Sequence, residues 1–219
     1  MGQGLIGLDG HQGIPDGTFV GMQSATAKVL CSQHNSVLSI LDSEAKRLSD
    51  ALGRFQSKSV FDEEVTVDGP LFERWLMKVA MGYLAAGQTQ VGRRYPAIRE
   101  VVAALFGVIP MTEPIGMYSM INVERHFDKA KEVLFRELAV LDPQGQTRIA
   151  GAFVALHGLP FLFSFGGPFP IEEYLRRPDG SSFLDPYDCT NARVSYRPNY
   201  MRISEDGKRQ LRVRFQWPG

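Results

Sequence analysis

Two side chains that commonly bind metal ions, Cys31 and His34, are separated by two residues and are followed at once by Asn35. A thiolate and an imidazole at this spacing can form one half of a tetrahedral zinc site, whose other ligands must come from elsewhere. From Ser36 onward the apolar residues recur at three and four positions, which predicts a helix. The stretch therefore combines metal-ligand chemistry with an element that could position it.

His11 lies twenty residues before Cys31, and Pro15 follows it closely. A histidine near a proline, followed by C-x-x-H-N at a helix start, resembles the HNH or ββα-metal nuclease element. The segments HNSVLSILDSEA and ERWLMK are similar to those of uncharacterised bacterial and phage proteins that carry such an element. The resemblance implies His11 as the base for phosphodiester cleavage and Asn35 as a residue that positions the loop or assists at the metal. It implies Cys31 and His34 as half of a structural zinc site. The implied cofactors are Zn²⁺ or Mg²⁺/Mn²⁺, and the absence of any cofactor is the alternative.

The element departs from the family pattern at defined positions. Only ten residues precede His11, and they contain no C-x-x-C pair to complete a four-ligand zinc site. The proline comes four residues after the histidine. The acidic residue that often adjoins the histidine in the family is here two residues before it, at Asp9. The zinc half-site is incomplete, which implies a truncated or degenerate relative beside the alternative of an active nuclease. Coincidence is the third interpretation, with Cys31 as a small buried residue and His34 and Asn35 as helix caps.

Arginines alternate with aromatic residues near the end of the sequence. On one face of a sheet they would form a phosphate-contacting patch with stacking partners nearby. A two-residue period, however, points Phe215 and Trp217 away from Arg212 and Arg214, which favours a solvated basic face over an aromatic core. The candidate nucleic-acid-binding residues are Arg197, Arg202, Arg212 and Arg214.

Two further chemical patterns have simpler structural interpretations. Cys31 could act as a thiolate nucleophile with His126 or His157 as its base, although His157 in the sequence HGLP is more simply a turn residue. Acidic pairs could bind a cation, although such pairs are usually solvated. These pairs are Glu172 with Glu173 and Asp185 with Asp188.

Composition limits the classes of function. The 219 residues contain 24 lysines and arginines and 24 aspartates and glutamates, and this zero net charge argues against a strongly electrostatic, non-specific nucleic-acid binder. Two distant cysteines and no charged-then-apolar leader predict a reducing, cytoplasmic location. The most apolar run, 151–167, is too short for a membrane span, so no membrane partner is expected.

The order of the predicted elements indicates an α+β fold, with about three N-terminal helices packed on a C-terminal antiparallel sheet. Short strands are expected near 5–8 and 18–22. Three helices are expected. The first begins at 36 and carries an apolar stripe from Val37 to Phe55, the second runs from Asp68 to Gly87, and the third covers 96–106. The predicted strands cover 117–123, 133–141, 147–156, 161–165, 194–196, 200–204 and 210–217, with a helix over 129–141 as the less favoured alternative.

Three segments follow from this order: a glycine-rich arm with the HNH-like element over 1–30, a helical part over 31–110 and a β-rich part over 111–219. Residues 31–219 are expected to form one cooperative domain. Two functions are consistent with the sequence. One is a nucleic-acid-associated relative of HNH endonucleases, and the other is a non-enzymatic module that binds a protein complex, such as a phage or mobile-element inhibitor.

Overall fold

A computed structural model describes residues 5–7, 19–21, 32–58, 62–85, 99–121, 132–141, 144, 147–166, 193–205 and 208–218. Its helices are α1 (Ser32–Val37), α2 (Ser39–Gln56), α3 (Gly69–Ala85) and α4 (Arg99–Leu105). Its strands are β1 (Leu5–Gly7), β2 (Phe19–Gly21), β3 (Asp62–Asp68), β4 (Ile115–Ile121), β5 (Glu132–Leu141), β6 (Thr147–Leu156), β7 (Leu159–Phe165), β8 (Arg193–Tyr196), β9 (Tyr200–Glu205) and β10 (Arg209–Gln216). The predicted α+β class is confirmed.

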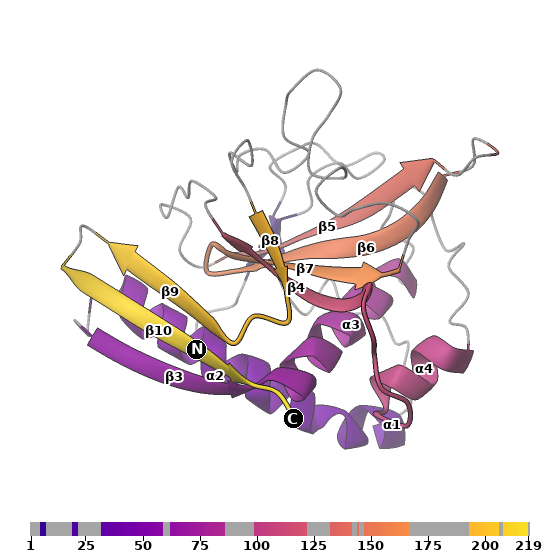
Figure 1. The fold of residues 1–219 in the computed structure, drawn as a ribbon, viewed down its shortest axis with the longest axis horizontal. Helices are drawn as coiled ribbons and strands as arrows, with labels where there is room; N and C mark the ends of the chain where they lie inside the picture. The colour runs from indigo at the N-terminus through magenta and orange to yellow at the C-terminus, as the bar shows by residue number, and fades with distance from the viewer. Residues whose placement is uncertain are drawn as a thin grey trace.

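The larger sheet has seven strands in the order β2-β1-β5-β6-β7-β4-β8 (Figure 1). Its neighbours are antiparallel except β1 and β5, which run parallel. The predicted strands over 133–141, 147–156 and 161–165 form the meander β5-β6-β7, so the alternative helix over 129–141 is wrong. His157 and Gly158, both at positive φ, make the two-residue turn between β6 and β7.

A second sheet has three strands in the order β3-β10-β9, with β3 parallel and β9 antiparallel to β10. The predicted strands over 200–204 and 210–217 are confirmed, whereas β3 is a strand that the sequence pattern did not reveal. Helix α2 packs against β3 and β10, and α3 contacts both sheets. Figure 1 shows the two sheets at different places along the molecule, with the helices beneath them.

The buried face of α2 carries Leu41, Ala45, Leu48, Leu52 and Phe55, as the stripe predicts. Two positions differ. The helix breaks at Leu38, so Leu38 enters the core and Val37 is 60% exposed. Glu44 lies outside the predicted apolar stripe, so it is expected to face solvent, but it is buried and its carboxylate accepts the Asp68 backbone N–H at 2.7 Å.

The start of α2 also differs from the expectation. Asn35 and Ser36 lie inside the short helix α1 rather than at a helix cap. The residue before α2 is Leu38, which makes no side-chain capping bond. The Ser39 hydroxyl instead donates to the Ser36 carbonyl at 2.7 Å, across the break between the two helices.

Helix α3 begins where Asp68 and Pro70 predict, and Asp68 Oδ1 accepts the Leu71 N–H at 2.9 Å. Its sequence predicts an apolar stripe of Leu71, Trp75, Leu76, Val79 and Tyr83, and the core face in the structure is broader than this stripe. Only Leu76 of that stripe is fully buried, while Leu71, Trp75, Val79 and Tyr83 are partly buried. The residues that go deepest include Phe72, Met77 and Ala80. Contact with both sheets explains the difference, because one apolar stripe can cover only one of them.

Helix α4 ends as predicted at Gly107, which has a φ of 73°. The Gly107 N–H donates to Ala104 O and the Val108 N–H donates to Ala103 O, which is a Schellman motif. None of the helices in the described parts of the chain is both long and apolar enough to cross a bilayer. The arm over 1–30 contributes β1 and β2 to the larger sheet, which confirms the two short strands expected there.

Candidate nucleic-acid interface

The three-stranded sheet has one apolar and one polar face because its sequences alternate. In β10, Leu211, Val213 and Phe215 are buried, while Arg212 and Arg214 point to the opposite side. Helix α2 covers the apolar side (Figure 1). The predicted two-residue period is confirmed, so Arg212 and Arg214 lie on a face that α2 leaves open, whereas Arg209 of the same strand is buried on the α2 side and donates to Phe55 O.

The strand register brings three of the arginines predicted to bind nucleic acid together with one tyrosine on the open face. Arg212 is the cross-strand partner of Arg202, and Arg214 is the partner of Tyr200. Directly opposite residues in an antiparallel pair have Cβ atoms about 4.5–5.5 Å apart. Arg202 and Arg214 are exposed, and Tyr200 is 49% exposed. We call Tyr200, Arg202, Arg212 and Arg214 the basic face.

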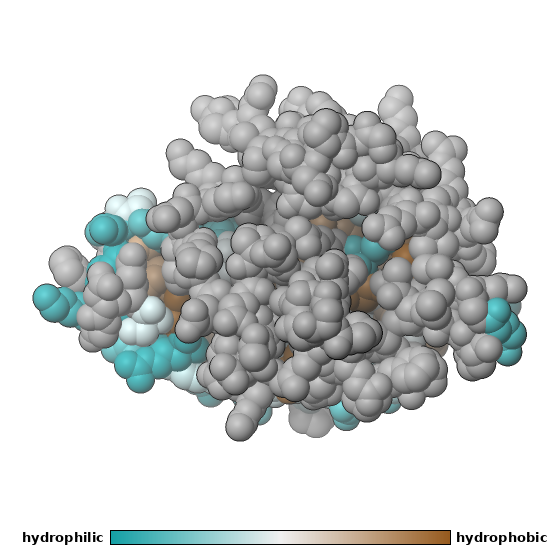
Figure 2. Space-filling view, turned by 90° about the horizontal axis from the view of Figure 1, so that it is seen from above, coloured by the Kyte–Doolittle hydropathy of each residue, from teal (hydrophilic) through white to brown (hydrophobic). Residues whose placement is uncertain are grey.

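Acidic residues of β3 border the basic face on one side. Arg212 Nη2 donates to Asp62 Oδ1 at 2.7 Å, and Arg212 Nη1 lies 3.9 Å from Glu64 Oε2. The hydrogen bond with Asp62 raises the pKa of Arg212. Arg202 and Arg214 have no ion-pair partner among the described residues, so within the described basic face these two guanidiniums carry the positive charge that no carboxylate offsets. Figure 2 shows hydrophilic residues gathered at this end of the molecule.

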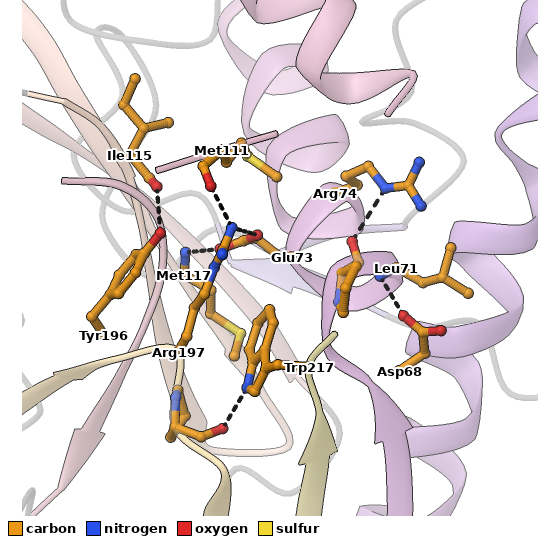
Figure 3. Close-up of polar contacts among 12 residues, drawn as sticks. Asp68, Leu71, Glu73, Arg74, Met111, Ile115, Met117, Tyr196, Arg197 and Trp217 are labelled. Atoms are coloured by element: carbon orange, nitrogen blue, oxygen red, sulfur yellow. Dashed lines mark hydrogen bonds and ion pairs between the residues drawn. The ribbon is translucent and has the colours of Figure 1, made fainter. Parts of the chain in front are cut away.

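Arg197 lies apart from the basic face, at the junction of the two sheets (Figure 3). Its Nε donates to Glu73 Oε1 at 3.0 Å, and its Nη2 donates to Glu73 Oε2 at 2.7 Å and to Met111 O at 2.8 Å. The guanidinium also lies 5.1 Å from the ring centroids of Tyr196 and Trp217. The structure therefore separates Arg197 from the other three predicted arginines.

Glu73 is the centre of this junction and is only 1% exposed. Besides Arg197, it accepts the Met117 N–H at 2.8 Å and thereby holds α3 to β4. Burial lowers the pKa of Arg197, but the hydrogen bond and charge of Glu73 outweigh it, so the net pKa is raised. Sequence reasoning missed this pair, although a glutamate next to Phe72 and one turn before Met77 occupies a core position.

A second polar cluster joins α2 to the turn between β6 and β7. Gln56 Nε2 donates to the His157 carbonyl at 2.6 Å. This bond directs the Oε1 atom of the same Gln56 side chain to His157 Nδ1, 3.1 Å away. This arrangement assigns the proton to Nδ1, so Nε2 accepts the Ser49 hydroxyl at 2.9 Å.

The order serine, histidine, amide resembles a nucleophile with its base and orienting group. Ser49, however, lies inside α2, where the neighbouring N–H groups are used by helical bonds and cannot stabilise an oxyanion. His157 is a turn residue, as predicted, and the hydrogen bonds of this cluster hold α2 to the turn between β6 and β7.

The predicted nuclease residues are described only in part. His34 and Asn35 are exposed on α1, and the His34 ring makes an edge contact with Phe106 at 5.5 Å between centroids. In the described ranges no group of three or more His, Cys, Asp and Glu residues could hold a metal ion. The other candidates lie outside those ranges: His11, Cys31, His126, Glu172, Glu173, Asp185 and Asp188.

Comparison with protein-family models finds no family that matches the chain, and searches for similar curated proteins and solved structures give no match either.

Proposed function

We propose that this protein associates with nucleic acid through the basic face. The observation that carries the proposal is the pair of exposed guanidiniums of Arg202 and Arg214, which have no ion-pair partner in the described part of the chain, beside the exposed ring of Tyr200. Guanidinium groups bind phosphate oxygens, and an aromatic ring offers a stacking surface to any base. The zero net charge makes this a local contact rather than a field around the whole protein.

Replacing Arg202 and Arg214 together by alanine is expected to remove most of the binding. Each phosphate contact to a single strand contributes about −0.7 to the slope of log affinity against log salt, so two contacts give about −1.4. We expect that slope for the unaltered protein and a slope near zero for the double variant. Fluorescence anisotropy of a labelled oligonucleotide, titrated at several salt concentrations, measures both.

A matched control for that experiment is the double replacement Lys46→Ala with Arg99→Ala. It removes the same charge from two exposed helical positions, on α2 and α4. Binding and slope should be retained. Equal losses in the two double variants would show a general charge effect and would contradict a site at the basic face.

We further propose that His11, Cys31, His34 and Asn35 form an HNH-like element that is related to HNH nucleases and is degenerate. Its ion would be zinc or Mg²⁺/Mn²⁺. The support is the order of these residues in the sequence. An active element should nick supercoiled plasmid with magnesium or manganese and should lose this activity in His11→Ala. Cleavage that survives the substitution, or the absence of both bound metal and cleavage, would contradict a working nuclease.

The second candidate function is a non-enzymatic module that binds a protein complex. It is favoured by exposed apolar side chains on α1, at the start of α2 and just after α4. Figure 1 shows α1 and α4 at the same corner of the molecule, where the His34 ring contacts Phe106. Val37, Ile40 and Val108 are 60%, 56% and 76% exposed. Clusters of exposed apolar residues mark protein-binding surfaces.

The second candidate predicts that Ile40→Asp with Val108→Asp abolishes capture of a stoichiometric partner from host extract. The same change should leave nucleic-acid binding at the basic face intact. Capture that is unaffected by these two charges would rule out this corner as the binding surface.

A further inference from the structure

We infer that the basic face takes a single strand of nucleic acid in preference to a duplex, an inference that rests on the proposed function. The width of the positive strip, the acidic border beside it and the position of the exposed Tyr200 ring all favour a single strand.

The positive strip is two strands wide. Its unmatched charges lie on β9 and β10, whose axes are about 4.8 Å apart in a sheet. On the β3 side the sheet presents the carboxylates of Asp62 and Glu64, and on the other side β9 is the edge of the sheet. A row of phosphates can follow the strip only if it stays over β9 and β10.

A duplex meets this surface poorly. Its two backbones lie about 6–12 Å apart across the grooves, which is more than the separation of about 4.8 Å between β9 and β10. The second backbone would lie either over Asp62 and Glu64, where like charges repel it, or beyond the edge strand, where the sheet offers it no contact. Its bases are also paired and stacked with one another, so none is free for Tyr200.

Tyr200 supplies the contact that only a single strand can use. Its ring stands across from Arg214 and two residues from Arg202, about 6.8 Å along the strand at about 3.4 Å per residue. A base stacked on the ring therefore leaves its flanking phosphates near both guanidiniums. Stacking and phosphate contacts are common to DNA and RNA, so single strands of both kinds should bind.

The test compares labelled single-stranded DNA, single-stranded RNA and duplex DNA of one length by fluorescence anisotropy. The unaltered protein should bind both single strands about tenfold or more tightly than the duplex, and Tyr200→Ala should weaken single-strand binding at least about fivefold. Tyr200→Phe keeps the ring and should retain binding. Duplex binding should not respond to either change, and thermal melting should confirm that both variants are folded.

The acidic border has its own test. Asp62→Asn with Glu64→Gln should strengthen duplex binding by a larger factor than single-strand binding, because it removes the repulsion from the second backbone. Duplex binding as tight as single-strand binding, or a Tyr200→Ala loss that is equal for both, would overturn the inference while leaving the proposed function intact. Absence of binding to all three probes, or binding indifferent to loss of Arg202 and Arg214, would overturn both.

Discussion

Replacing Arg197 by methionine is expected to lower the free energy of unfolding by about 3 kcal/mol. This value is the lower end of the range observed when one partner of a buried ion pair is removed. Glu73 is 1% exposed, and the change removes both guanidinium bonds to its carboxylate. The carboxylate would keep only the Met117 N–H as a described donor and would lose its cationic partner at a buried position. Denaturant unfolding of the single variant and the unaltered protein measures the difference.

The charge explanation is separated from simple loss of packing by a double-mutant cycle with Glu73→Gln. The side-chain amide oxygen that this substitution introduces can still accept the Met117 N–H, and the buried charge disappears. The double variant should therefore be more stable than Arg197→Met alone, with a coupling free energy of at least about 1 kcal/mol. Additive effects would show that the ion pair contributes little and that the ring contacts with Tyr196 and Trp217 position the side chain.

Most of the strands could be predicted because their signals are local. The meander β5-β6-β7 is marked by β-branched and aromatic residues and by the sequence HGLP at its second turn, and the alternation in β10 assigned its two faces correctly. In contrast, β3 has the acidic sequence DEEVTVD, which lacks a continuous apolar pattern. It forms a strand because β10, more than a hundred residues later, supplies its backbone partner.

The candidate site was predictable to the same extent. Alternation places Arg212 and Arg214 on one face, but only the register with β9 shows that Arg202 and Tyr200 join them. The alternation of arginines with aromatic residues groups Arg197 with them in the sequence. Arg197 lies before β9 at a φ of 42°, and its partner Glu73 is 124 residues away. A charge pair over that separation leaves no local pattern to detect.

The second large effect on the free energy of unfolding is expected at Gly151, where even the addition of one methyl group should be destabilising. It lies within β6, between Leu138 of β5 and Ser164 of β7 in the register of the larger sheet. A Cβ atom there would overlap the backbone oxygen of Phe163 and would lie 3.3 Å from Leu138 Cδ1. Because the first contact is backbone, relief requires the paired strands to shift. Gly151→Ala is therefore expected to lower the free energy of unfolding by about 2–3 kcal/mol.

Gly82→Ala is the matched control, because it adds the same methyl group at a site with nothing within 4 Å of the new Cβ. Gly82 lies inside α3, where alanine is favoured over glycine by about 1 kcal/mol, so this variant should be more stable than the unaltered protein. Thermal or denaturant unfolding of the two variants should thus give shifts of opposite sign. A Gly151→Ala protein as stable as the unaltered one would mean that β6 and β7 are not held in this register, because the pairing of Gly151 with Ser164 is what brings the Phe163 carbonyl so close.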